Sequence, residues 1–287
     1  MLTKIRRFVK TCYKLVCKEV GKYSNKYSKK TYTQPQLITI NCLREKLKMD
    51  YRSITDLLAE TPIILEEIGL DSIPHYSTIQ RSFRRVKKDC LYRLINLSSK
   101  LSGLTGNLAI DATGFQRGTS SSYYNKRCGL EIKSIKTTLL VDLKSKSVLS
   151  LHTTCSRMHD VRIAPKVIDM AVKDYKISRL TADKGYDSCN FRMHLRSQGI
   201  FPIIKYRVFE ESHNLLNEVM DGFGYSKRSN IESVNSAIKR KYGDKLRSRG
   251  WRMQFKEITV KAFVYNIDRS LANCCIYLSL ISPNWAN

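Results

Sequence analysis

The sequence predicts a mixed α/β sheet with helices packed against it, preceded by an all-α N-terminal region. Three observations support this fold class. Residues 35–101 carry apolar side chains at helical spacing, divided into short segments by polar residues and prolines. From residue 106 the pattern changes to short runs rich in β-branched residues. These runs then alternate with helical segments, as expected for a sheet that is covered by helices.

Composition favours a folded protein with a polyanionic partner. Hydrophobic residues make up 42% of the 287 residues, which supports a sizeable core and excludes global disorder. Lysine and arginine total 51 against 25 aspartate and glutamate, a net charge of +26 spread along the chain. A folded protein with this charge is expected to bind a polyanion. Nucleic acid is the leading candidate, and an anionic membrane surface is the weaker alternative.

The nine cysteines are scattered along the chain and form no Cys-x-x-Cys pair. Neither a zinc site nor a disulfide framework is therefore predicted, and the pattern fits buried thiols in a reducing compartment. The basic N-terminus lacks the pattern of a signal peptide. The longest apolar run, near Leu271 to Ile281, is too short to span a bilayer. We therefore expect a soluble intracellular protein.

Residues 1–34 are expected to form a basic amphipathic helix and a linker. Residues 1–30 hold ten lysines or arginines and one acid, Glu19, and apolar residues recur among them at helical spacing. Such a helix can lie along DNA, on a membrane surface, or against the body of the protein with its basic face in solvent. The polar segment from residue 25 to 34 is the predicted linker.

Residues 35–101 are predicted to be a helical, helix-turn-helix-like DNA-binding region. Ser77 is a candidate N-cap for a basic helix that begins at Thr78. Short helices followed by a capped basic helix are typical of a helix-turn-helix, whose second helix enters the major groove of DNA. The helices expected before it are Leu37 to Met49, Tyr51 to Ala59 and Ile63 to Ile68.

The basic helix has an apolar side and a side suited to contacting DNA. Its apolar stripe consists of Ile79, Phe83 and Val86. Gln80, Arg81 and Arg84 are left exposed and are the candidate DNA-binding residues, with Gln80 and Arg81 suited to reading base edges. The alternative is an ordinary helical bundle with a charged surface.

The region from residue 106 to 287 is expected to be one domain with a long C-terminal helix. A loop rich in Gly, Ser and Tyr, from Gly114 to Gly129, separates its first strand from a hairpin. The predicted strands are Asn107 to Thr113, Ile132 to Asp142, Val148 to Cys155, Ile177 to Ala182 and Phe201 to Lys205. The predicted helices are Val161 to Lys173, Asn190 to Ser197, Tyr225 to Lys239 and Phe255 to Leu280. Candidate helix caps are Asp160 and either Asp187 or Ser188.

Three acidic residues lie at positions in the predicted elements where the presence of a carboxylate calls for an explanation. Asp111 interrupts an apolar strand, where a charge is costly unless it is compensated. Asp183 ends another strand, beside a glycine turn. If these two strands are neighbours, both carboxylates lie at one edge of the sheet, and Glu232 on a packed helix completes a cluster of three. Hard divalent cations such as Mg²⁺ relieve the repulsion within such a cluster, and two ions can catalyse phosphoryl transfer.

The helix predicted from residue 225 to 239 combines a polar stripe with an apolar packing face. At about 100° per residue, one narrow side of it carries Tyr225, Arg228, Glu232 and Lys239. The separate apolar flank consists of Ile231, Val234 and Ile238. A lone acid in a basic and aromatic stripe suits a carboxylate that binds a cation while its neighbours hold phosphates. The alternative is a solvated face on which Arg228 and Glu232 pair at i, i+4 spacing.

The spacing of this stripe carries a resemblance to a known family. It runs Tyr, two residues, Arg, three residues, Glu, six residues, Lys. Together with Leu-Ala-Ile-Asp-Ala-Thr-Gly at 108–114 and Thr-Ala-Asp-Lys-Gly-Tyr-Asp-Ser at 181–188, it resembles prokaryotic insertion-sequence transposases of the DDE type. The resemblance is to the insertion sequence four/five superfamily, and it covers about residues 107–270.

The resemblance implies a ribonuclease-H-like catalytic domain over residues 106–287 that cleaves DNA at inverted-repeat ends and joins the ends to target DNA. Asp111, Asp183 and Glu232 would be the catalytic residues and metal ligands, with two Mg²⁺ ions, or Mn²⁺ in their place, as cofactors. The DNA end would be contacted by Tyr225, Arg228 and Lys239. The implied partners are terminal inverted repeats, target DNA and a second copy of the chain, with no membrane. The implied location is the cytoplasm, in association with the nucleoid.

Two other functions fit the same residues. A catalytically silent DNA-binding protein descended from a transposase keeps the fold and the positive charge. A structure-specific nuclease cleaves DNA without strand transfer. The presence of all three acids and of the polar stripe counts against the silent protein.

Overall fold

The computed structural model describes residues 3–118, 134–155 and 158–281, with side chains to residue 273. The chain divides into two compact units. The first is Met1–Ser102 together with Thr259–Asn287, and the second is Gly103–Ile258. The division predicted from sequence, at residues 1–34, 35–101 and 106–287, stays a prediction. Most of the predicted loop from Gly114 to Gly129 lies outside the described residues.

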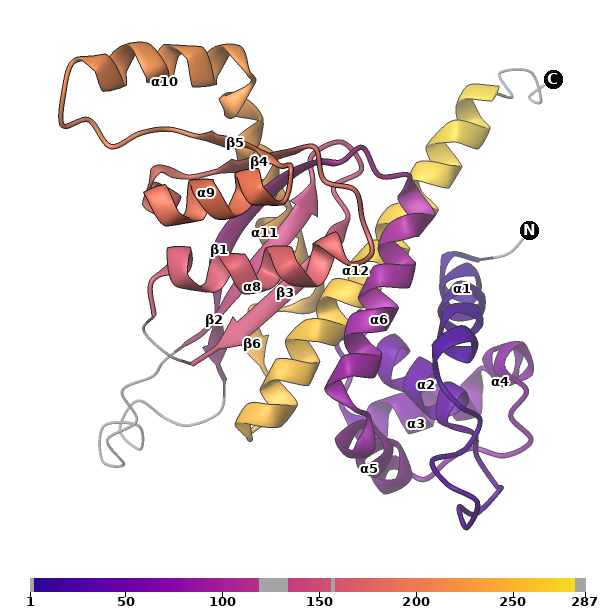
Figure 1. Cartoon of the computed structure of the whole chain (residues 1–287). Helices are drawn as coiled ribbons and strands as arrows, with labels where there is room; N and C mark the ends of the chain where they lie inside the picture. The colour runs from indigo at the N-terminus through magenta and orange to yellow at the C-terminus, as the bar shows by residue number, and fades with distance from the viewer. Residues whose placement is uncertain (1–2, 119–133, 156–157, 282–287) are drawn as a thin grey trace. The chain divides into compact units, whose positions relative to one another are not determined.

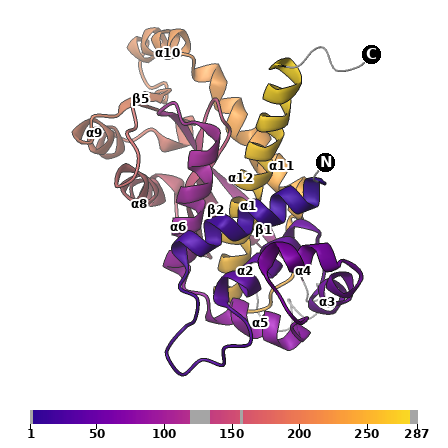
Figure 2. The same ribbon diagram turned by 90° about the vertical axis from the view of Figure 1, so that its right-hand side faces the viewer.

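The first unit is all-α over its described residues, and α1 packs against other helices of this unit. The apolar side of α1, which includes Phe8, Cys12 and Val16, is buried against α2, α4 and α6 (Figure 2). The sequence left DNA, a membrane surface and the body of the protein as possible positions for this basic amphipathic helix. In the structure α1 lies on the body of the protein. The helices are α1 (Lys4–Glu19), α2 (Gln34–Lys46), α3 (Tyr51–Glu60), α4 (Pro62–Ile68), α5 (Tyr76–Arg85) and α6 (Lys88–Ser99), followed by a 3₁₀ turn, η1 (Lys100–Ser102).

Polar caps determine where the helices of the first unit begin. The Thr33 hydroxyl accepts the Gln36 backbone N–H at 3.3 Å, and the Gln36 side chain accepts the Thr33 N–H at 2.8 Å. This capping box starts α2 three residues before the predicted Leu37. Asp50 accepts the backbone N–H groups of Arg52 and Ser53, both at 2.8 Å, and so caps α3.

Helix α5 begins at Tyr76, which makes the predicted N-cap at Ser77 wrong. The residue in the cap position is His75, whose Nδ1 accepts the backbone N–H of Ser77 at 3.4 Å. The predicted apolar stripe is confirmed, because Ile79, Phe83 and Val86 are all buried. On the other side of the helix Gln80, Arg81 and Arg84 are exposed.

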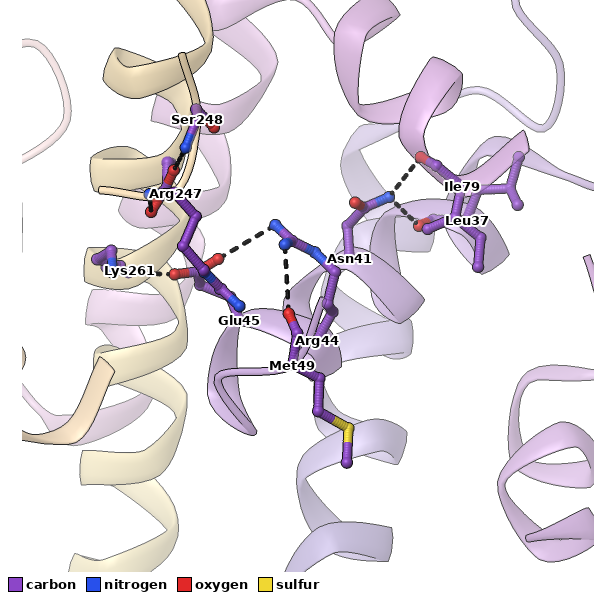
Figure 3. Close-up of polar contacts among 10 residues, drawn as sticks. Leu37, Asn41, Arg44, Glu45, Met49, Ile79, Arg247, Ser248 and Lys261 are labelled. Carbon is purple, nitrogen blue, oxygen red and sulfur yellow. Dashed lines mark hydrogen bonds and ion pairs between the residues drawn. The ribbon is translucent and has the colours of Figure 1, made fainter. Parts of the chain in front are cut away.

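A charged network is buried inside the first unit (Figure 3). Glu45 Oε1 of α2 forms an ion pair with Lys261 Nζ at 3.0 Å, and both side chains are at most 1% exposed. Arg44 Nη2 lies 3.2 Å from the second carboxylate oxygen of Glu45. Lys261 belongs to α12 (Trp251–Ile281), the long C-terminal helix. Charged groups are rarely this buried unless they are paired, so the contact ties α12 to α2.

The second unit contains a mixed sheet, as predicted. Its strand order is β3-β2-β1-β4-β5, and β6 pairs with the far end of β1. β1, β2 and β3 are antiparallel neighbours, whereas β4 and β5 run parallel to β1. The strands are β1 (Asn107–Arg117), β2 (Ser134–Asp142), β3 (Val148–Thr154), β4 (Arg179–Ala182), β5 (Phe201–Ile204) and β6 (Lys245–Leu246).

Helices cover both faces of this sheet. α8 (Asp160–Val172) and α9 (Cys189–Ser197) lie on one face, and α11 (Ser229–Tyr242) lies on the other (Figures 1 and 2). Leu108 and Ile110 of β1 point into the core under α8 and α9. Side chains alternate along a strand, so Ala109 and Asp111 point to the α11 face.

Some elements were not predicted. α10 (Ser212–Gly222) lies in a segment that the sequence left without an element, and β6 is only two residues long. The C-terminal helix begins at Trp251, four residues before the predicted Phe255. None of the described helices combines the length and the apolar composition needed to cross a bilayer.

Candidate active site

Strand pairing brings two of the three predicted acids together. β1 and β4 are parallel neighbours, with Ile110 opposite Ala182. Asp111 directly follows Ile110, and Asp183 directly follows Ala182, so the two acids lie at the same level of adjacent strands. Neighbouring strands are about 4.8 Å apart, which places the two carboxylates within reach of one cation. The expected clustering of the two acids required these two strands to be neighbours, and the structure meets that condition.

Asp111 is a half-buried carboxylate that lies close to other acidic side chains. Its Oδ2 accepts from Asn235 Nδ2 of α11 at 3.3 Å. Burial raises the pKa of Asp111, and the negative charges of Glu232 and Asp160 raise it further. A hydrogen bond from a backbone N–H and the positive charge of Arg228 act in the opposite direction. The site therefore favours a positive charge next to Asp111.

Asp183 is exposed just beyond β4, at the start of a 3₁₀ turn, η2 (Lys184–Tyr186). The Tyr225 hydroxyl donates to Asp183 Oδ1 at 3.4 Å. Burial and the adjacent Asp183 carboxylate both raise the pKa of Tyr225. Tyr225 therefore stays protonated and acts as a hydrogen-bond donor to the acid.

Glu232 completes the acidic group from the first turn of α11. Its side chain is 54% exposed and pairs with Arg228 Nη1 at 2.9 Å. Partial burial lowers the pKa of Arg228, but the negative charges of Glu232, Asp183 and Asp111 outweigh this effect and raise it. The Arg228 guanidinium therefore acts as the counter-charge shared by all three acids.

The polar stripe starts on a 3₁₀ turn rather than on one continuous helix. Tyr225–Arg228 forms η3, and α11 begins at Ser229, so the predicted helix is wrong for its first four residues. Gly224 precedes the turn with φ +86°, a conformation that glycine adopts readily and that stops a helix from continuing backward. The turn and the helix together direct Tyr225, Arg228 and Glu232 toward Asp111 and Asp183.

The packing face predicted for this helix is confirmed. Ile231 and Val234 are fully buried, and Ile238 is 2% exposed. These three residues hold α11 against the sheet beside β1. Lys239 continues the stripe, and its Nζ lies 5.7 Å from the centre of the Phe115 ring of β1.

Sequence reasoning missed two residues around the acids, Asn235 and Tyr186, and interpreted a third, Asp160, as a helix cap. Asn235 is the partner of Asp111, as described above. Tyr186 is buried, its hydroxyl has no hydrogen-bond partner among the described residues, and burial with the charges of Asp160 and Asp111 raises its pKa. Asp160 is the first residue of α8 rather than its cap, and it pairs with Lys136 of β2 at 2.7 Å.

Asp187 has a structural role. Its Oδ1 accepts two hydrogen bonds from Arg192, at 3.1 and 2.8 Å, and its Oδ2 accepts the Arg207 backbone N–H at 2.8 Å. These bonds hold α9 to the segment after β5. Ser188, the other predicted cap, occupies the N-cap position of α9 without a side-chain hydrogen bond.

The donor set fits a hard divalent cation. Asp111, Asp183 and Glu232 supply only carboxylate oxygens, the ligands that Mg²⁺ and Mn²⁺ prefer. Within residues 3–118, 134–155 and 158–281, no three His, Cys, Asp or Glu side chains already form a metal-holding group. Arg228 instead supplies the positive charge among the acids.

Comparisons with known proteins agree with this arrangement. Residues 103–267, more than half of the chain, match the family model described as the transposase DDE domain. The fold is similar to a chain in the cryo-electron microscopy structure of a piggyBac transposase synaptic complex with hairpin DNA, with a TM-score of 0.51. The two sequences are 10% identical, and the match covers 96% of this chain and 74% of that chain, so it supports the fold alone.

A second solved structure gives a weaker match. It is a simian T-cell lymphotropic virus intasome in complex with PP2A regulatory subunit B56 gamma, 13% identical, with 64% of this chain and 68% of that chain covered. Its TM-score of 0.27 is too low to carry an argument. No curated protein sequence matches the chain.

Proposed function

The chain belongs to the transposase DDE-domain family, and on this basis we propose that it cuts DNA at the inverted-repeat ends of a mobile element and joins those ends to target DNA. The spacing of Tyr225, Arg228, Glu232 and Lys239 supports assignment to the prokaryotic insertion sequence four/five superfamily. The net charge of +26 supports binding to a phosphate backbone.

One observation carries the proposal: the pairing of Ile110 with Ala182, which brings Asp111 and Asp183 side by side beneath α11. Asp111, Asp183 and Glu232 are the proposed catalytic residues and would hold two Mg²⁺ or Mn²⁺ ions. Bound there, the ions would activate the attacking oxygen and stabilise the leaving oxygen of a phosphodiester. Binding requires Glu232 to exchange its ion pair with Arg228 for a metal.

The chain's other residues would position the acids and the DNA. Asn235 donates to Asp111, and Tyr225 donates to Asp183, so each strand acid has its own orienting partner. Arg228 neutralises the acids without metal and, once released from Glu232, is free to bind a phosphate of the DNA end. Lys239 would add a second phosphate contact.

We propose that the second unit contains a ribonuclease-H-like domain, supported by the strand order β3-β2-β1-β4-β5. The helical region at 35–101 would recognise the terminal inverted repeats through Gln80, Arg81 and Arg84, all exposed on α5. Two copies of the chain would act together, because two DNA ends must be processed in one reaction.

The test is end cleavage by purified variants. A duplex carrying one inverted repeat is incubated with Mg²⁺ and with Asp111→Asn, Asp183→Asn or Glu232→Gln protein. We expect each variant to lose cleavage and to keep its affinity for the duplex. Asp169→Asn is the matched control, because Asp169 lies on α8 and pairs with His194 of α9, and it should cleave normally. Full cleavage by any folded variant of the three acids contradicts the proposal.

The Arg228–Glu232 ion pair favours a second candidate, a catalytically silent DNA-binding protein, because it occupies one proposed metal ligand. Wild-type protein that binds its repeat but nicks it in neither Mg²⁺ nor Mn²⁺ would support this candidate. A nuclease without strand transfer would cleave the repeat but leave a pre-cut end unjoined.

A further inference from the structure

A groove lies beside the acids, on the α11 side of the sheet. Its volume is about 380 Å³, within the usual size of pockets that hold one small ligand. Strands β1, β4 and β5, the turn after β2, and the segment from Phe223 to Asn230 line it. We call it the basic groove, and its polar lining residues include Asn107, Lys144, Arg179, Thr181, Lys227 and Asn230.

The basic groove lies on the same face of the sheet as the candidate active site. Thr181 and Arg179 lie two and four residues before Asp183 on the same strand, and alternate residues share a face. At about 3.3 Å per residue, the groove therefore runs from about 7 Å to about 13 Å from the acid. α11 borders both regions, with Asn230 at the groove and Glu232 among the acids.

Three cations of the groove have no partner among the residues that the structure describes. The side chains of Lys144, Arg179 and Lys227 are exposed, and none makes a hydrogen bond or ion pair with any described residue. No acidic side chain is among the described residues that line the groove. Other lysines of the second unit differ: Lys205 pairs with Asp221 at 2.6 Å, and Lys136 pairs with Asp160 at 2.7 Å. Unpaired cations around one hollow attract an anion.

Part of the lining of the groove is apolar and aromatic. It includes Leu143, Ile203 and Phe223. Phe223 is 42% exposed and meets the Phe201 ring edge-on, with 5.0 Å between the ring centres. A phosphate alone does not use such an apolar lining. Aromatic side chains between cations are typical of proteins that stack unpaired bases while holding the backbone.

We propose that the basic groove binds an unpaired strand of DNA next to the acids. One base packs against Phe223, and the flanking phosphates meet Arg179, Lys144 and Lys227. Bases in a duplex stay stacked inside the helix, so a duplex offers its backbone and base edges but no base face that could pack against Phe223. The proposal rests on the proposed function and adds that the substrate is held with a single-stranded segment beside the site of cleavage.

The test compares blunt and tailed DNA by fluorescence anisotropy. Full-length protein is titrated in EDTA with a repeat-containing duplex that is either blunt or extended by a short single-stranded tail of either polarity. Phe223→Ala should weaken binding to one tailed duplex about tenfold or more and leave the blunt duplex unchanged. Phe223→Tyr keeps the ring and should restore affinity for the tail.

The cations are tested through salt dependence. Arg179→Ala/Lys227→Ala removes two phosphate contacts and should lower the log–log salt slope for tailed DNA by about 1.4. Lys166→Ala/Arg196→Ala removes the same charge from exposed positions on α8 and α9, on the opposite face of the sheet, and should leave the tail preference intact. Melting temperatures of all variants identify any that fail to fold.

Three results would overturn the proposal: equal losses on blunt and tailed DNA, equal losses in the groove and control variants, or no loss at all. Equal loss on both DNAs would make the groove part of a general duplex surface. Because binding is measured in EDTA with all three acids intact, failure here leaves the cleavage test of Asp111, Asp183 and Glu232 unaffected. Conversely, cleavage by the acid variants would contradict the proposed function without bearing on tail binding.

Discussion

Lys261→Met is expected to destabilise the first unit strongly, because it removes one partner from a fully buried ion pair. Lys261 is 0% and Glu45 1% exposed, with 3.0 Å between the charged atoms (Figure 3). At that separation the attraction is about 5 kcal/mol for an effective dielectric constant near 20. Removing one partner of a buried pair costs about 3–5 kcal/mol, because the other charge stays buried. Arg44 still neutralises Glu45 from 3.2 Å, so we expect a value near 3 kcal/mol.

Urea denaturation followed by circular dichroism measures this loss. The urea concentration at the midpoint of unfolding should fall, while the slope of the unfolding free energy against urea concentration stays unchanged. The melting temperature should fall by on the order of 10 °C. Arg93→Met is the matched control, because it breaks the pair with Glu19 in which the arginine side chain is 57% exposed. Such surface pairs contribute at most about 1 kcal/mol.

A double variant separates the lost pair from other effects. Adding Glu45→Gln to Lys261→Met removes the remaining buried charge and keeps an acceptor for Arg44, so stability should partly return. If Lys261→Met costs no more than Arg93→Met, Arg44 alone compensates Glu45 and the reasoning is refuted. If the double variant is less stable than the single, the loss comes from packing rather than from charge.

Three further predictions concern other parts of the molecule. Burial raises the pKa of Asp111 in the folded state above its value in the unfolded state, so the folded state binds a proton more readily. The free energy of unfolding therefore falls as pH rises from the unfolded-state pKa to the folded-state pKa. Asp111→Asn should therefore raise the melting temperature at pH 7 in EDTA and abolish stabilisation by Mg²⁺; an unchanged response to Mg²⁺ would contradict the metal assignment. Gln80→Ala or Arg81→Ala should weaken binding to the inverted repeat by about 1–3 kcal/mol but spare unrelated DNA, as a competition assay would measure. Gly118→Ala should cost about 1–3 kcal/mol in denaturation, because its Cβ would lie 2.3 Å from the Leu246 carbonyl oxygen.

The sequence predicts what depends on local pattern. An apolar run interrupted by an acid indicates the strand that carries Asp111, and an apolar run that ends in an acid indicates the strand before Asp183. Helical spacing indicates the buried flank around Val234. Alternating strands and helices also predict a mixed sheet. Each of these signals lies within a dozen residues of chain, where side-chain periodicity reports burial directly.

The sequence does not predict what depends on contacts between distant segments. β6 exists only through its pairing with β1, and two residues carry no period. Lys261 is buried, but charged side chains usually lie at the surface unless they are paired. Its burial therefore cannot be predicted before its partner is known. Asp160 has the sequence context of a helix cap, and only the fold brings Lys136 beside it. Gly224 was the available signal for the turn at Tyr225, because a residue in the left-handed region interrupts a helix.

Because β1 pairs with β4 in parallel, the number of residues between the start of each strand and its acid cannot change without displacing the acid. Side chains alternate along a strand, so loss of one residue between Asn107 and Asp111 would turn the carboxylate toward the face covered by α8 and α9. The connection from Ile204 to Tyr225, which carries α10, lies outside this pairing and can change length without moving either acid. Relatives of this chain are therefore expected to differ in the length of that connection while keeping the distance from strand start to acid constant.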